Sequence, residues 1–166
     1  MCCVLCSFKD SEEVCTWVCL AASRLVADDA CCQALLMGGV VKTLSTVVVV
    51  HASCEMVAQD GCQVLGKLIT FCFDLASPLQ EHPPDFELDT CALIAKTAAG
   101  EAVAKVLALY TNDEATMEQA CCAVCALALD PDGSCQNLVS FGVLKSLPKV
   151  LQSLYNSRPV ILWGLK

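Results

Sequence analysis

The sequence predicts an all-α protein in which helices stack side by side, and three observations support this fold class. A phrase occurs twice, as CQALLMGGVVKTL at residues 32–44 and as CQNLVSFGVLKSL at residues 135–147. Apolar residues in and around both copies recur at helical spacing. The chain is 56% hydrophobic but only 5% aromatic, and small aliphatic side chains favour close packing of one helix on another.

The distance between copies predicts a repeat protein. A weaker third copy of the phrase surrounds Gly100, which lies 42 residues before Gly142. A period of that length is typical of stacked helical units. Each unit is therefore expected to contain a helix that ends near a glycine, a second helix after it, and then a third.

The first two helices of a unit follow from the glycine phrase. Asp28 and Asp29 mark the expected start of the helix before Gly39, because carboxylates cap helix N-termini. After each glycine the apolar residues keep to one helical face. They are Val40, Leu44, Val47 and Val48 in one copy, and Val143, Leu147, Val150, Leu151 and Leu154 in the other. Valine favours strands, but the surrounding period predicts a helix across 47–50.

The third helix of a unit shows small or apolar residues at relative positions 0, 3, 4 and 7. The three copies are Val18, Ala21, Ala22 and Leu25, then Gly61, Val64, Leu65 and Leu68, then Ala120, Ala123, Val124 and Leu127. The steps between copies are 43 and 59 residues. Small residues at these positions predict a close approach between neighbouring helices.

The longer step has a visible cause in residues 74–90, where Pro78, Pro83 and Pro84 are mixed with acidic residues. This composition predicts an acidic, proline-rich insertion loop, and it favours disorder over a functional loop. We expect a single domain over 1–166. Its predicted parts are a third helix at 14–27, a repeat at 28–73, the loop at 74–90, a repeat at 91–130 and a partial repeat at 131–166.

The glycine phrase, followed about 20 residues later by the third-helix pattern, resembles the armadillo repeat, with the HEAT repeat as the near alternative. The resemblance covers most of the chain. It implies a right-handed α-α superhelix of about three repeats, incomplete at both ends. It also implies that other proteins bind along a concave surface lined by the third helices.

The resemblance also suggests which residues would line such a groove. Importin-alpha-like members carry a Trp and an Asn four residues apart on each third helix, and these grip an extended peptide. The matching pairs here are Leu20 with Arg24, Gln63 with Lys67, and Cys122 with Ala126. Because the Trp/Asn ladder is missing, binding of a nuclear localisation signal is not supported.

A partner-binding groove is still predicted. Its residues are Thr16, Leu20, Arg24, Gln59, Gln63, Lys67, Glu118 and Cys122. Arg24 and Lys67 would place two positive charges on the groove of an acidic protein and attract an acidic or extended partner segment. The alternative is that both are ordinary solvated helix residues.

Charge and hydropathy argue against other partners. The net charge of −8 repels phosphates and disfavours a nucleic-acid role. The ten Lys and Arg residues form no run, so a basic membrane-binding patch is not expected. No secretory signal is visible and the valine run is too short to cross a bilayer. We therefore expect a cytoplasmic protein in a reducing compartment, with the nucleus as an alternative.

The fifteen cysteines are expected to be reduced core residues, because many lie in apolar helical patterns and a thiol behaves as a small hydrophobe. The spacings at Cys3/Cys6 and Cys122/Cys125 could suit zinc or a redox dithiol, but the pairs are far apart and lack nearby histidines. A nucleophilic pairing of His51 with a cysteine is not favoured. No metal, cofactor or catalytic residue is predicted.

The favoured function is a non-enzymatic protein–protein interaction scaffold. One alternative is a regulatory repeat segment of a larger multidomain protein, for example a kinase-like one. Another is a cysteine-based metal or redox protein. Because both ends of the chain are apolar, we expect a segment of a longer repeat protein that exposes an apolar face at Trp163 and self-associates.

Overall fold

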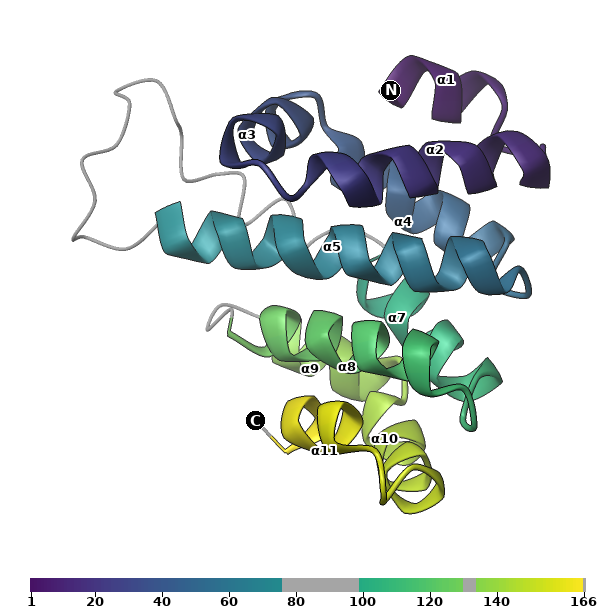
Figure 1. Cartoon of the computed structure of the whole chain (residues 1–166), viewed down its shortest axis with the longest axis vertical. Coiled ribbons are helices and arrows are strands. Elements are labelled where there is room, and N and C mark those ends of the chain that lie inside the picture. Colours follow the sequence, from purple (N-terminus) through teal and green to yellow (C-terminus); the bar gives the residue numbers. More distant parts are fainter. Residues whose placement is uncertain (76–98, 130–133, 166) are drawn as a thin grey trace.

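The computed structural model describes residues 1–75, 99–129 and 134–165, and every regular element in these ranges is an α-helix (Figure 1). The first five are α1 (Cys2–Ser7), α2 (Glu12–Leu25), α3 (Asp29–Met37), α4 (Val40–Val50) and α5 (Glu55–Leu75). The others are α7 (Ala99–Leu109), α8 (Glu114–Ala128), α9 (Ser134–Ser140), α10 (Val143–Ser153) and α11 (Arg158–Gly164). The predicted all-α class is confirmed.

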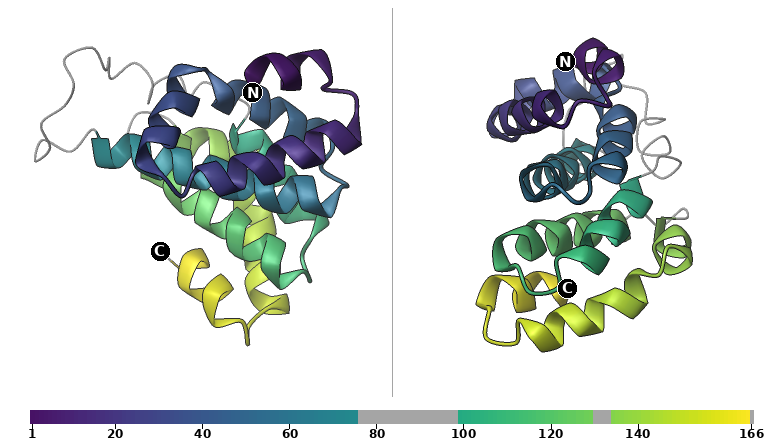
Figure 2. Two further views of the ribbon diagram at one scale, coloured as in Figure 1. Left: turned by 45° about the horizontal axis from the view of Figure 1, so that its top comes forward. Right: turned by 90° about the vertical axis from the view of Figure 1, so that its right-hand side faces the viewer.

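Eight of the described helices lie in two rows. In one row α5 packs between α2 and α8, and α11 packs on the other side of α8. In the second row α4 packs between α1 and α7, and α10 packs on α7. Figure 1 shows the first row from the front, and the right-hand view of Figure 2 shows both rows side by side. The most extensive contact between helices is that of α5 with α8.

Side-chain caps explain where several helices begin. The Asp28 carboxylate accepts the backbone N–H of Cys31 at 2.9 Å at the start of α3, as the sequence predicted. Asp113 does the same for Thr116 at 2.8 Å at the start of α8. The hydroxyl oxygens of Ser11 and Ser157 cap α2 and α11 in the same way. Each cap satisfies an N–H that has no partner inside the helix.

The repeated glycine is a left-handed turn residue. Gly39 has φ 67° between α3 and α4, and Gly142 has φ 82° between α9 and α10. Gly100, in the weaker third copy, instead lies inside α7. A Cβ on Gly100 would lie 3.3 Å from Cδ2 of Phe141, so this glycine provides room for a ring rather than a turn. The weak copy therefore does not repeat the geometry of the other two.

Replacing Gly39 or Gly142 by Ala is expected to lower the free energy of unfolding by about 1–2 kcal/mol for each site. The cost comes from the backbone angle alone, because a Cβ at either position would meet no atom within 4 Å. Urea denaturation followed by circular dichroism measures it. Gly39→Asn is the control, since Asn adopts this conformation more readily. Equal losses for Ala and Asn would contradict the explanation.

The close approach predicted at the small residue Gly61 occurs along α5, and Gly66, which is not part of the predicted pattern, provides a second one. A Cβ added to Gly66 would lie 3.3 Å from Cα of Ala123 in α8. A Cβ added to Gly61 would overlap a methyl group of Val48 in α4. The two missing side chains therefore let α5 pack closely against α8 in its own row and against α4 in the second row.

The free cysteines recorded among the described residues are buried, half-buried or exposed, and the half-buried ones are Cys31, Cys54, Cys122 and Cys125. Six are buried in the core, as predicted: Cys15, Cys19, Cys32, Cys62, Cys72 and Cys121. Cys3 and Cys6 are exposed on α1, so the prediction that cysteines fill the core is wrong for these two. The physical reason is that α1 lies at the end of its row and packs mainly against α4.

The helix bounds decide several other predictions made from the sequence. The valine run is helical and forms the end of α4. The helix predicted at 14–27 is α2, which is preceded by α1, a helix that the sequence patterns did not indicate. In the predicted insertion loop only residues 74 and 75 are described, and they end α5. The rest of that loop lies outside the described residues.

Candidate functional site

The predicted groove residues lie on three adjacent helices. Thr16, Leu20 and Arg24 are on α2, Gln59, Gln63 and Lys67 are on α5, and Glu118 and Cys122 are on α8. A spacing of four places the members of each set on one face of their helix. Arg24 and Lys67 are exposed and the other six are half-buried. Because α5 packs between α2 and α8, the fold brings the three sets onto neighbouring helices.

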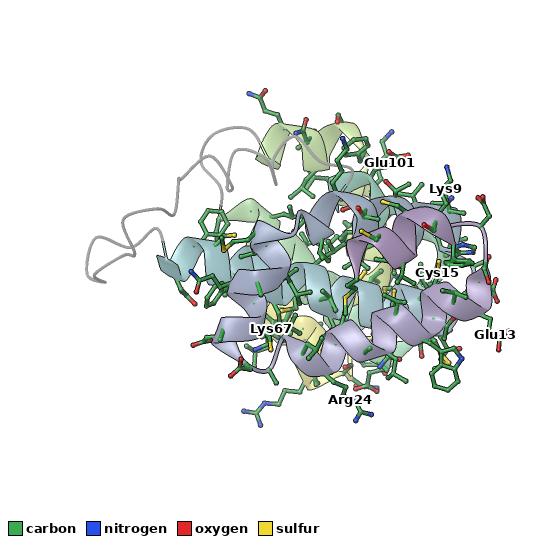
Figure 3. The ribbon with its side chains drawn as sticks, turned by 90° about the horizontal axis from the view of Figure 1, so that it is seen from above. Lys9, Glu13, Cys15, Arg24, Lys67 and Glu101 are labelled. Carbon is green, nitrogen blue, oxygen red and sulfur yellow. The ribbon has the colours of Figure 1, made fainter. Side chains whose placement is uncertain are left out.

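The two cations of this surface lie on the same side of the molecule (Figure 3). The pKa of the Cys32 thiol in α3 is raised, mainly by burial and then by the charges of Asp29 and Asp28, whereas the charge of Lys67 lowers it. This influence on Cys32 indicates that Lys67 lies near the start of α3. Lys67 therefore shares its surroundings with two carboxylates.

At the other end of the predicted groove, the Thr16 side chain joins two helices. Its hydroxyl donates to the carbonyl of Glu12 at 2.9 Å within α2. The same oxygen lies 3.6 Å from Sγ of Cys54, just before α5. This contact helps to set the position of α2 relative to α5.

A cavity of about 490 Å³ lies between α8 and the helices around its C-terminal half. Thr70 contributes from α5, Val124 and Cys125 from α8, Leu147 from α10 and Trp163 from α11. Cys122 also lines it, so one predicted groove residue borders this cavity. No residue among those described in its lining is Asp, Glu, Lys, Arg or His.

The predicted exposed face at Trp163 needs correction. The indole is half-buried, not exposed, and it lines the cavity. The apolar side chains that α11 and the residue after it do expose are Leu162 at 47% and Leu165 at 73%. The cavity has no signal in the sequence because it forms only where α5, α8, α10 and α11 meet. The apolar run at 160–165 indicated a helix but not which helix it packs against.

Burial strongly affects three core thiols. It raises the pKa of Cys19 and Cys62 to about 12 and that of Cys121 to about 11. After burial, the nearby Cys121 and Cys19 also raise the pKa of Cys62, so the Cys62 thiol on α5 lies near thiols of both α2 and α8. A neutral thiol is a weak nucleophile. At neutral pH these groups are packing residues.

The imidazole of His51 is joined to backbone. Its Nε2 atom lies 2.6 Å from the carbonyl oxygen of Lys9, in the loop between α1 and α2. The ring therefore links the end of α4 to the loop between α1 and α2. The nearby Cys54 thiol contacts Thr16. Within the described part of the chain, no three His, Cys, Asp or Glu side chains form a group that could hold a metal ion.

No single described helix has the length and hydropathy needed to cross a bilayer, although α3 and α4 together would meet this test as a pair bent by 84°.

Comparison of the chain with protein-family models, curated proteins and solved structures found no match in any of the three.

Proposed function

We propose that this chain is a non-enzymatic protein interaction scaffold, built as an armadillo-like solenoid, whose α2, α5 and α8 bind an extended segment of a partner protein. The observation that carries the proposal is the order of contacts in the two rows, in which each helix packs on its neighbours in the row. Stacks of helical repeats have this pattern of nearest-neighbour contacts. Such a stack presents equivalent residues of successive repeats on one continuous surface.

The chemistry of the surface suits an extended peptide. Gln59 and Gln63 are half-buried on α5, and each amide can both donate to and accept from a peptide backbone. Arg24 and Lys67 are exposed and would attract acidic side chains of the partner. Since the chain carries a net charge of −8, a nucleic acid is a poor alternative partner.

Two observations support a non-enzymatic role. The pKa values of Cys19, Cys62 and Cys121 are raised, which is the opposite of the shift that activates a nucleophilic cysteine. The His51 ring is hydrogen-bonded to a backbone carbonyl.

The twelve free thiols recorded among the described residues fit a reducing compartment, and we propose the cytoplasm, with the nucleus as an alternative.

Peptides selected on the wild-type chain from a random display library are expected to be rich in Asp and Glu. Fluorescence anisotropy measures their affinity for purified variants. The double variant Arg24→Glu/Lys67→Glu should weaken binding by at least about tenfold, because it replaces attraction by repulsion. The matched control is Lys42→Glu/Lys149→Glu, which changes the charge equally at exposed residues of the second row and should retain the affinity.

The proposal fails if no peptide is selected, or if both double variants bind the selected peptides as tightly as the wild type. One further double variant separates recognition of the peptide backbone from recognition of its charge. Gln59→Ala/Gln63→Ala is expected to weaken binding at high and low salt alike. The charge reversal is expected to act mainly at low salt, because surface charges are screened.

A further inference from the structure

We infer that the cavity lined by Thr70, Val124, Cys125, Ala128, Leu147 and Trp163 is a binding site for a small, uncharged, mainly hydrocarbon molecule. We call it the α8–α11 cavity. Its volume of about 490 Å³ falls within the range of about 300–1,000 Å³ that is typical of ligand pockets. The inference does not depend on the proposed partner-binding function, although Cys122 borders both surfaces.

The lining decides the class of ligand. Carbon and sulfur atoms dominate it, and the described lining offers no ionised side chain to pair with a charged ligand. A carboxylate or ammonium group placed there would lose its hydration without compensation. Sulfur atoms are polarisable and pack well against apolar groups. A neutral ligand is therefore favoured over its charged analogue.

The hydroxyl oxygen of Thr70 can accept a hydrogen bond from a hydroxyl group of the ligand. The Thr70 hydroxyl donates to the carbonyl of Gly66 at 2.8 Å, which directs its hydrogen into α5. The oxygen of Thr70 keeps lone pairs that can accept a hydrogen bond. An apolar molecule with a single hydroxyl group, such as an aliphatic alcohol, matches this arrangement.

Two walls of the cavity, α8 and α11, are joined by a side-chain hydrogen bond that does not involve a ligand. Ser157, at the start of α11, donates to Oε1 of Glu114, at the start of α8, at 2.7 Å. The two helices are thus joined at their beginnings, whereas the cavity lies toward their ends, beside Cys125 and Trp163. Figure 1 shows α8 and α11 next to each other. A preformed cavity avoids the cost of ordering its walls on binding.

The first experiment compares 1-decanol with decanoate, which have the same chain length but differ in charge. The chain contains two tryptophans, and Trp17 is 62% exposed on α2. In a Trp17→Phe background, fluorescence reports on Trp163 alone. Decanol is expected to change this fluorescence with a saturable dependence, and decanoate to require at least tenfold higher concentration.

Two substitutions are designed to fill the cavity. Val124→Phe and Ala128→Phe each add a ring to the lining and should abolish the response to decanol. Val139→Phe is the matched control, because Val139 is exposed on α9 outside the lining, and it should respond like the wild type. Circular dichroism verifies that each variant is folded.

Alkylation of the unmodified chain provides a readout that does not depend on a variant folding. Decanol should slow the reaction of Cys125 with iodoacetamide, as measured by peptide mass spectrometry, by at least threefold. The exposed Cys6 is outside the lining and should react at an unchanged rate. Equal rates at Cys125 with and without decanol would overturn the inference.

The remaining outcomes are also decisive. A response to decanol that persists in both filled variants, or equal binding of decanol and decanoate, would contradict the site or its ligand class. If a second copy of the chain covers the cavity, the wild type will sediment as a dimer and Val124→Phe as a monomer. That result would replace the small molecule by a protein partner and overturn the inference.

Discussion

Gly66→Leu is expected to lower the free energy of unfolding by more than about 3 kcal/mol, or to prevent folding, because it forces apart the most extensive helix contact of the structure. A Cβ at Gly66 would lie 3.3 Å from Cα and 3.4 Å from N of Ala123. Backbone atoms cannot rotate away as a side chain can. The gain in helix propensity on replacing glycine is about 1 kcal/mol and does not offset this clash. Urea denaturation measures the difference.

Position 61 provides a contrasting control on the same helix. A Cβ on Gly61 would overlap a side-chain methyl of Val48, so the obstacle there can be removed by mutation. Gly61→Ala and Val48→Ala should each destabilise the chain, the second because it leaves a cavity. The double variant should recover about 1–3 kcal/mol relative to the sum of the two losses.

The same test at position 66 should give no recovery. Ala123→Gly removes a side chain, but the nearest atoms to the new Cβ belong to the Ala123 backbone. If Ala123→Gly restores Gly66→Leu to wild-type stability, or if Gly66→Leu is as stable as the wild type, then α5 and α8 are not packed as closely as the structure shows.

The free energy of unfolding is expected to fall steeply above pH 9, by up to about 4 kcal/mol per pH unit. Folding raises the pKa of Cys19 and Cys62 from an ordinary value of 9.0 to about 12, and that of Cys121 to about 11, mainly through burial. Between these limits the unfolded chain releases thiol protons that the folded chain keeps. Each such group contributes about 1.4 kcal/mol per pH unit.

The sign of this effect follows from the direction of the pKa changes. Below pH 9 the three thiols are neutral in both states and do not make stability depend on pH. As the pH rises from 9 toward 11 or 12, ionisation increasingly favours the unfolded state, because the buried thiolate is disfavoured. Urea midpoints measured at half-unit steps of pH, converted to free energies, give the slope.

A matched comparison is needed to assign the alkaline loss of stability to the buried thiols. The variant Cys19→Ala/Cys62→Ala/Cys121→Ala should be less stable at pH 7 but should lose most of the slope. Cys3→Ser/Cys6→Ser changes exposed thiols and should keep it. A slope that is the same in all three proteins would show that buried thiols do not cause the alkaline loss.

The helical elements were largely predictable because their signals are local. The left-handed glycines at 39 and 142, the Asp28 cap and the third-helix pattern in α5 all depend on residues within one or two turns of each other. α1 was missed because six residues containing three cysteines give too short a pattern to indicate a helix. The weaker copy of the phrase led us to expect at Gly100 the same role as at Gly39 and Gly142, but Gly100 lies inside α7. Its missing side chain makes room for Phe141, which is distant in the sequence.

The candidate sites differ in how far sequence could predict them. The spacing of four along α2, α5 and α8 follows from helical geometry, so the predicted groove residues could be named from the sequence. That they lie on neighbouring helices depends on the contacts of α5 with α2 and α8. The α8–α11 cavity had no local signal, because its walls come from four different helices, α5, α8, α10 and α11, and exist only where these helices pack together.

The sequence by itself determined where most helices begin and end, since caps, turn glycines and apolar periodicity act over a few residues. The tertiary structure decided which faces meet. It placed Gly66 against the Ala123 backbone, turned Trp163 inward to the cavity and left Cys3 and Cys6 exposed. These outcomes depend on the shapes of side chains on different helices, and an apolar pattern specifies that a face is buried without specifying its partner.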